Sequence, residues 1–226
     1  MRRAVAAEFI GTAFLLAVVV GSGIMGEQLS NGNAAVALLA NALATGAGLY
    51  VLITTLGPIS GAHFNPVVSV VMALRGDLQR PLLPFYVSAQ FIGALLGVMA
   101  AHAMFELPLL QTSTHVRTGM PQMFSEFVAT AGLLGAILLV SRQQPAKVAA
   151  SVACYITAAY WFTASTSFAN PAVSVARALT NTFAGIRHAD VPGFIAAQIC
   201  AMALCAVLAW RQRKAEITSP QSAARL

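Results

Sequence analysis

The chain has 226 residues, of which 58% are hydrophobic and only 9% are charged. Because a soluble domain usually carries about 25% charged residues, this composition excludes an ordinary soluble protein and predicts one that crosses a membrane several times. Most of the length is needed for the spans, which leaves a single domain over residues 1–226.

The sequence shows none of the side-chain patterns that support enzymatic chemistry. It has no nucleophile–base arrangement, no metal-ligand cluster and no phosphate-binding loop, so we expect no catalytic residues, no metal and no cofactor. The three cysteines, Cys154, Cys200 and Cys205, lie in apolar segments at no metal-binding spacing. We interpret them as small core residues, with a thiol that binds a soft ligand as the alternative.

Six apolar segments are candidates for membrane spans. In chain order they cover about 5–25, 34–56, 82–104, 122–141, 147–164 and 191–210. The opening segment continues through Val20 without a signal-peptide cleavage site, so it is read as the first span. The second is expected to end at Gly57-Pro58, and a loop over 105–121 joins the two halves. The chain is expected to fray from Arg211 onward, with a polar tail at 213–226.

A repeated motif lies midway through each half of the chain. Asn65-Pro66-Val67 and Asn170-Pro171-Ala172 each follow a loop and precede Val-Ser-Val. Asn caps a helix and Pro fits its first position, so the motifs predict short helices over about 66–75 and 171–180. Such helices are about 15 Å long, half of a hydrocarbon core of roughly 30 Å. Their positive N-terminal ends would therefore face each other near the midplane.

The rest of each half repeats as well. Glu8 and Glu126 open similar motifs in the first and fourth spans, and Gln90 matches Gln198 in the third and sixth. Each half holds three spans, an odd number, so the second copy is inserted upside down. The sequence predicts an all-α membrane protein with six transmembrane helices and two re-entrant half-helices, in inverted repeats of about 1–104 and 122–212.

A carboxylate inside an apolar span is unfavourable unless it has partners. Glu8 and Glu126 are expected to accept backbone N–H groups from the two irregular loops, each loop having its own carboxylate. Gln90 and Gln198 are expected to help them. A proton or ion relay is the alternative role for the two carboxylates.

The distribution of basic residues predicts the orientation in the membrane. Arg117, Arg177 and Arg187 fall on one side. Ten others fall on the opposite side, which is therefore cytoplasmic and holds both termini: Arg2, Arg3, Arg75, Arg80, Arg142, Lys147, Arg211, Arg213, Lys214 and Arg225. The net charge of +6 thus reflects topology, and we expect no nucleic-acid site.

These motifs together resemble the major intrinsic proteins, the aquaporins and glycerol facilitators. The resemblance rests on both Asn-Pro repeats, the opening Ala7-Glu-Phe-Ile-Gly-Thr12, the loop Ser60-Gly-Ala-His-Phe-Asn65 and the paired Gln residues, and it covers almost the whole chain. It implies a pore through each subunit of a homotetramer embedded in the lipid bilayer. It also implies passive conduction of water or small uncharged solutes, with ions excluded.

The resemblance also implies a selectivity filter of four side chains. Counted from the two Asn residues, its positions are Thr45, Ala158, Ser167 and Val173, with Thr157 as a substitute for Ala158 if a gap intervenes. Nearly all members have Arg where this chain has Val173. Four small side chains predict a wide ring without a fixed positive charge.

Two further residues near the pore have alternative roles. Arg177 lies one helical turn beyond Val173, so it replaces the missing charge in the outer vestibule or pairs with loop carbonyls. His63 lines the passage and responds to pH, or it orders the first loop.

Ser174 and Ala178 follow the water-channel pattern, whereas Val173 and the segment 182–186 resemble a bacterial branch associated with arsenic resistance. This branch implies a bacterial inner membrane protein that passes arsenite, methylated arsenicals or glycerol. The alternatives are an ordinary water-selective channel, and an ion-coupled transporter in which Glu8 and Glu126 are the coupling groups.

Overall fold

The computed structural model describes residues 1–218, and within them the chain forms eight α-helices and four short 3₁₀ helices, without strands. The α-helices are α1 (Arg2–Leu29), α2 (Ala34–Ser60), α3 (Pro66–Arg75), α4 (Leu83–Met104), α5 (Met120–Gln143), α6 (Val148–Phe162), α7 (Pro171–Ala176) and α8 (Val191–Thr218). The 3₁₀ helices are η1 (Arg80–Leu82), η2 (Pro145–Lys147), η3 (Arg177–Leu179) and η4 (His188–Asp190).

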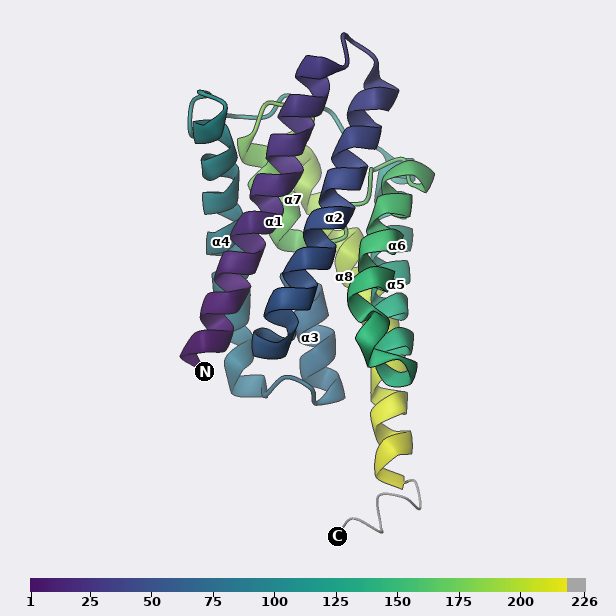
Figure 1. The fold of residues 1–226 in the computed structure, drawn as a ribbon. Helices are drawn as coiled ribbons and strands as arrows, with labels where there is room; N and C mark the ends of the chain where they lie inside the picture. Colours follow the sequence, from purple (N-terminus) through teal and green to yellow (C-terminus); the bar gives the residue numbers. More distant parts are fainter. Residues whose placement is uncertain (219–226) are drawn as a thin grey trace.

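The long helices run side by side as a bundle, with α3 toward one end and α7 toward the other (Figure 1). Helix α1 packs against α2 and α4, and α5 packs against α6 and α8. The two halves meet where α2 packs on α6, and each short helix packs on the last long helix of the other half, α3 on α8 and α7 on α4. This exchange places both Asn-Pro motifs in the interior.

Five helical segments are long and apolar enough to cross a membrane: Arg2–Leu29, Ala34–Ser60, Arg80–Met104, Met120–Gln143 and His188–Arg211. Helix α6 has 15 residues, fewer than the roughly 20 that a full crossing usually takes. It is preceded by η2 and takes the sixth place in the bundle, between α2 and α5.

The helix boundaries follow local signals where these are strong. Helix α3 begins after Asn65, whose side chain accepts a hydrogen bond from the Val67 N–H, and ends at Gly76, whose φ of 101° is left-handed. Its bounds are those expected from the sequence. Helix α2 does not stop at Gly57-Pro58 as expected but continues to Ser60, because Pro58 removes only one donor and the reversal occurs at Gly61, with φ of 87°.

The ends of α7 and α8 also differ from those expected from the sequence. Helix α7 has only six residues and passes into η3, since the Arg177 carbonyl accepts a hydrogen bond from the Ile186 N–H and the chain folds back. Helix α8 continues beyond 210 to Thr218, through residues that are mostly good helix formers. The expected tail is therefore partly helical, and its portion at 219–226 lies outside the described residues.

Helices α1 and α4 approach each other unusually closely. A Cβ atom on Gly97 would lie 2.1 Å from the Ala13 carbonyl oxygen, and one on Gly93 would lie 2.4 Å from that of Phe9. The two glycines are four residues apart and therefore form the small-residue face that membrane helices use for close packing. This contact brings Glu8 on α1 beside Gln90 on α4.

Candidate functional site

The two Asn-Pro turns are hydrogen-bonded to each other across the centre of the molecule. Asn65 Nδ2 donates to the Ala169 carbonyl and Asn170 Nδ2 donates to the Phe64 carbonyl, each at 2.7 Å. The Oδ1 atom of each Asn caps its own helix, accepting from the N–H of Val67 or of Ala172 at 3.1 and 3.0 Å. The positive N-terminal ends of α3 and α7 are thereby held against each other.

Each loop before an Asn-Pro turn is held by one buried carboxylate. Glu8 accepts hydrogen bonds from the backbone N–H groups of His63 (3.0 Å) and Phe64 (2.7 Å) and from Ser60 Oγ (2.6 Å). Glu126 accepts from the N–H groups of Phe168 and Ala169, both at 2.8 Å. Neither carboxylate lines the central cavity described below.

A glutamine and a serine complete each of these networks. Gln90 Nε2 donates to Glu8 and to Ser69 Oγ, both at 2.8 Å. Gln198 Nε2 donates to Glu126 at 2.7 Å and to Ser174 Oγ at 2.9 Å. A role for the two serines in this network was not predicted, although Ser69 and Ser174 occupy the same position in the repeated Asn-Pro-x-Val-Ser motif, which was a usable signal.

The loops are bent because several non-glycine residues adopt left-handed backbone. Ala62 and Phe64 in the first loop have φ of 50° and 49°, and Thr166, Ser167 and Ala169 in the second have φ of 61°, 53° and 48°. Such conformations persist only where surrounding contacts impose them. The carbonyl groups of Ala62, His63 and Ser167 accept no hydrogen bond from another described residue, so they remain free to accept one from a small molecule.

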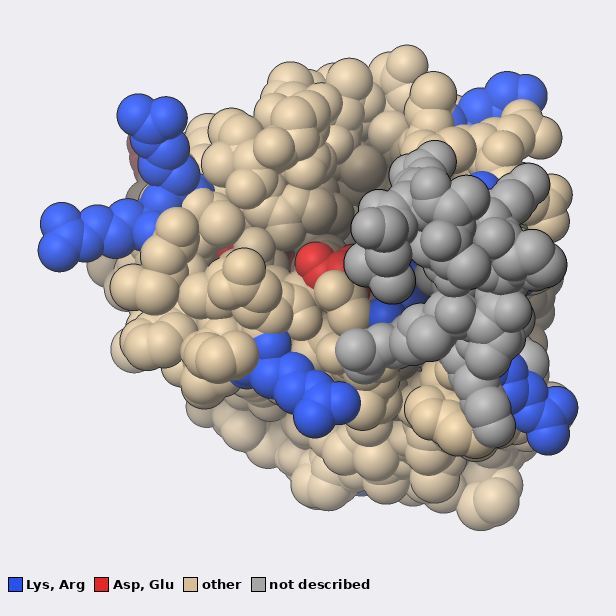
Figure 2. All heavy atoms as spheres, turned by 90° about the horizontal axis from the view of Figure 1, so that it is seen from below, with Lys and Arg blue, Asp and Glu red and all other residues tan. Residues whose placement is uncertain are grey.

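A cavity of about 540 Å³ runs past the two turns and is lined by both Asn65 and Asn170. Toward the end that carries the N-terminus it is lined by Asp77, Gln79 and Ser141, and toward the other end by Arg177. Figure 2 shows the first of these ends, with Lys and Arg around the rim and acidic side chains nearer the middle. Asp77 at this mouth is paired with Arg75 at 3.0 Å.

The expected filter positions are only partly brought together. Thr45, Ser167 and Val173 line the cavity. The expectation that Ala158 belongs to the filter is wrong, because this residue is exposed on the outer face of α6 and does not line the cavity. Its substitute Thr157 does not line the cavity either. The residues of α6 that do so are Val152, Ile156 and Tyr160. Their spacing of four keeps them on one helix face, whereas Ala158, two residues from Ile156 and Tyr160, faces away.

Tyr160 changes the chemistry expected of this region. Its hydroxyl group forms a hydrogen bond of 3.2 Å with Thr45 Oγ1. Ser167 Oγ is buried and has no hydrogen-bond partner among the described residues. The cavity wall here is therefore one aromatic ring, three hydroxyl groups and an aliphatic side chain, rather than four small residues.

Arg177 lines the cavity on the outer side of these residues and is only 2% exposed. Its Nε donates to the Ala184 carbonyl, and its Cζ lies 3.5 Å from the centre of the Phe168 ring. Neither Nη atom has a hydrogen-bond partner among the described residues, nor does Arg177 form an ion pair with any of them. Its charge is thus available to the cavity.

His63 also lines the cavity, on the opposite side of the Asn pair. Its Nδ1 lies 3.1 Å from Ser69 Oγ, and its ring lies 5.5 Å from that of Tyr86. The side chain is therefore tied into the network of the first loop while one edge of it faces the passage. Val67 and Ala172, the third residues of the two motifs, are buried.

Comparison with known proteins places this arrangement in a family. Residues 1–160 match the family model described as major intrinsic protein. The chain is 55% identical over 208 residues to the aquaglyceroporin AqpS of Rhizobium meliloti, covering 90% of this chain and 89% of that one. It is 36% identical to human Aquaporin-9 over 102 residues, which cover 43% of this chain and 32% of that one.

A structural comparison supports the same assignment at the level of the fold. The aquaglyceroporin of Plasmodium falciparum has a TM-score of 0.67 with this chain, at 18% identity, over 93% of this chain and 94% of that one. With the family model matching well over half of the residues, the assignment is secure. The chain belongs to the major intrinsic protein family of membrane channels.

Proposed function

We propose that this protein is a passive channel for water and for uncharged solutes larger than water, with neutral arsenite, methylated arsenicals and glycerol as the leading candidates. The observation that carries the proposal is the cavity lined by both Asn65 and Asn170, which extends from Asp77 to Arg177. Its central part is flanked by two helix N-termini, which attract electron-rich oxygens and repel cations.

The solute class follows from the side chains at the outer part of the cavity. Hydroxyl groups of Thr45, Tyr160 and Ser167 face a passage whose fourth side is the aliphatic Val173. A small polyhydroxy solute has hydroxyl groups that exchange hydrogen bonds with this wall and an apolar face that fits the valine. Because position 173 carries no charge, the positive charge near the filter comes from Arg177 in the outer vestibule.

A coupled transporter is disfavoured by the placement of the carboxylates. Coupling requires Glu8 or Glu126 to exchange protons or ions with the pathway. Both are fully buried, accept hydrogen bonds from the loops and from a glutamine, and do not line the cavity. We therefore assign them a loop-supporting role.

The proposal includes the setting of the channel. The name of the relative AqpS and its bacterial source favour a bacterial inner membrane. The first helix begins, and the last helix ends, at the end of the bundle shown in Figure 2 (Figure 1). Basic residues surround that face, which supports the proposal that it is cytoplasmic. A homotetramer with one passage per subunit is the assembly that the family implies.

Purified protein in lipid vesicles tests the transport mode. Uptake of glycerol and of neutral arsenite is followed under a solute gradient, then repeated with an imposed membrane potential and with an imposed pH gradient. A passive channel gives the same flux in all three conditions. Uptake against the solute gradient, driven by either imposed gradient, would instead establish coupling.

A further inference from the structure

A second arginine, Arg117, extends from the loop that joins the two halves and contacts the segments on either side of α7. Its Nε donates to the Gly185 carbonyl at 2.8 Å, and its Nη1 donates to the Ser165 carbonyl at 3.1 Å and to Thr166 Oγ1 at 3.4 Å. One guanidinium group thus connects the segment before α7 with the segment after it.

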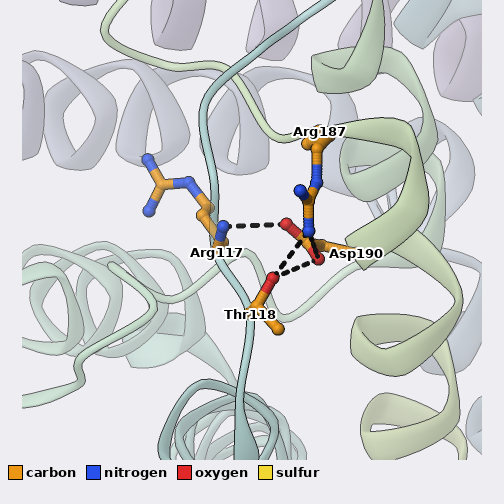
Figure 3. Close-up of polar contacts among 4 residues, drawn as sticks. All are labelled: Arg117, Thr118, Arg187 and Asp190. Carbon is orange, nitrogen blue, oxygen red and sulfur yellow. Dashed lines mark hydrogen bonds and ion pairs between the residues drawn. The ribbon is translucent and has the colours of Figure 1, made fainter.

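The backbone of Arg117 is fixed by a separate cluster. Asp190 Oδ2 accepts a hydrogen bond from the Arg117 N–H at 2.9 Å, while Oδ1 accepts from Thr118 Oγ1 at 2.6 Å and from Arg187 at 3.0 Å. Figure 3 shows the side chain of Arg117 pointing away from this carboxylate. Within the described residues Arg117 forms no ion pair, so Asp190 anchors the loop without pairing with the guanidinium charge.

The guanidinium group of Arg117 shares an aromatic partner with Arg177. Its Cζ lies 5.1 Å from the centre of the Phe168 ring, and that of Arg177 lies 3.5 Å from the same centre. Both distances are within the range of cation–π attraction. Phe168 and Arg177 line the cavity, whereas Arg117 does not. Because both guanidinium groups lie on the Phe168 ring, two positive charges without carboxylate partners among the described residues lie close to the outer end of the cavity.

Arg117 also binds a segment whose backbone is strained. Thr166 and Ser167 are left-handed, with φ of 61° and 53°, and Ser167 supplies the unpartnered hydroxyl group of the cavity wall. A conformation of this kind reverts unless neighbouring contacts hold it. Arg117 binds the residue immediately before Ser167 and the one before that.

We propose that Arg117 is a positioning residue for the outer end of the passage and that, together with Arg177, it supplies the positive field that keeps cations out where other members have an arginine at the position of Val173. This inference rests on the proposed channel function. Both guanidinium groups lie against the Phe168 ring. Neither occupies position 173, where the side chain is the uncharged valine.

The test measures cation leak and water permeability on the same lipid vesicles. Cation leak is recorded as H⁺ entry under a K⁺ diffusion potential with an internal pH-sensitive dye, and water permeability by stopped-flow light scattering. Arg117→Gln is expected to raise the leak about tenfold while water permeability stays within twofold of wild type. Arg117→Lys, which keeps the charge, is expected to keep the leak close to the wild-type value.

Arg80→Gln is the control, because it removes an exposed positive charge from the opposite end of the molecule and leaves Phe168 and the Asp190 cluster intact. It is expected to leave the leak unchanged. The proposal is overturned if Arg117→Gln leaks no more than wild type, or if the Lys and Gln variants leak equally, which would indicate a purely structural role. Wild-type vesicles no more permeable to water than empty ones would instead reject the channel function itself.

Discussion

The hydroxyl groups of Thr45 and Tyr160 lie 3.2 Å apart at the outer part of the cavity, although the two residues are 115 positions apart in the sequence. The contact joins α2 of the first half to α6 of the second. It places an aromatic ring in the wall where four small residues were expected. We therefore expect Tyr160 to limit the size of the solutes that pass.

Replacing Tyr160 tests this assignment. Tyr160→Ala removes the ring and is expected to raise glycerol permeability about tenfold, because discrimination by fit in a small pocket is typically of this size. Tyr160→Phe keeps the ring and removes the hydroxyl group, so the size limit should persist. Ala158→Phe serves as control: the side chain at 158 is exposed, and solute permeabilities should not change. If Ala158→Phe blocks permeation, residue 158 rather than Tyr160 belongs to the filter.

The buried carboxylate Glu8 makes the first loop sensitive to a conservative change. Glu8→Gln places an amide donor where Ser60 Oγ, two backbone N–H groups and Gln90 all donate. At least one buried donor is then left unpartnered, and the free energy of unfolding is expected to fall by about 3 kcal/mol. Thermal unfolding in detergent measures the loss. Glu27→Gln, at an exposed position, should unfold at the wild-type temperature.

The close contact of α1 and α4 predicts a steric effect. Gly97→Ala places a methyl group against the Ala13 carbonyl, a backbone atom that cannot move aside, and is expected to destabilise the protein by about 2 kcal/mol. Gly135→Ala, where an added Cβ meets no atom within 4 Å, should be neutral or slightly stabilising. Equal stability of the two variants in a thermal melt would contradict the packing described.

Cation exclusion at the outer end is expected to be independent of pH between 5.5 and 8. Burial lowers the pKa of Arg117 to about 10, against the opposing effect of Glu126, so the guanidinium remains charged over this range. Burial and, to a lesser extent, Arg117 lower the pKa of His115, which disfavours its charged form. The H⁺ leak, recorded at pH 5.5 and at pH 8 with equal driving force, should be the same. A leak that grows several-fold at pH 8 would assign the barrier to a group titrating in between.

Local signals account for what the sequence predicted well. Asn65 and Gly76 bracket α3, so its bounds could be predicted to the residue. Each half of the sequence has one Glu and one Gln at matching places in apolar spans, which predicted that Gln90 assists Glu8 and Gln198 assists Glu126. The two hydrogen bonds are present. The boundary at Pro58 failed because a single proline near a helix end removes only one donor.

Contacts between residues far apart in the sequence could not be predicted from the sequence. Counting back from Asn170 predicted that Ala158 lines the passage. The loop over 163–169 is irregular, so a count through it does not give the face of α6 that points inward. The spacing of four between Val152, Ile156 and Tyr160 was the available clue to that face. Arg117 and Asp190 lie in connecting segments without periodicity. Nothing in their sequence context indicates that the loop between the halves returns to Phe168.

The most direct test of the central claim compares wild type with Val173→Arg in stopped-flow experiments on lipid vesicles. The solutes are water, glycerol and neutral arsenite, and Val173→Met, which adds bulk without charge, is the control. We predict that wild type passes all three and that the Arg variant loses glycerol and arsenite while keeping part of the water flux. If wild type passes only water and Val173→Arg changes nothing, the passage is limited elsewhere, and the protein is a water channel.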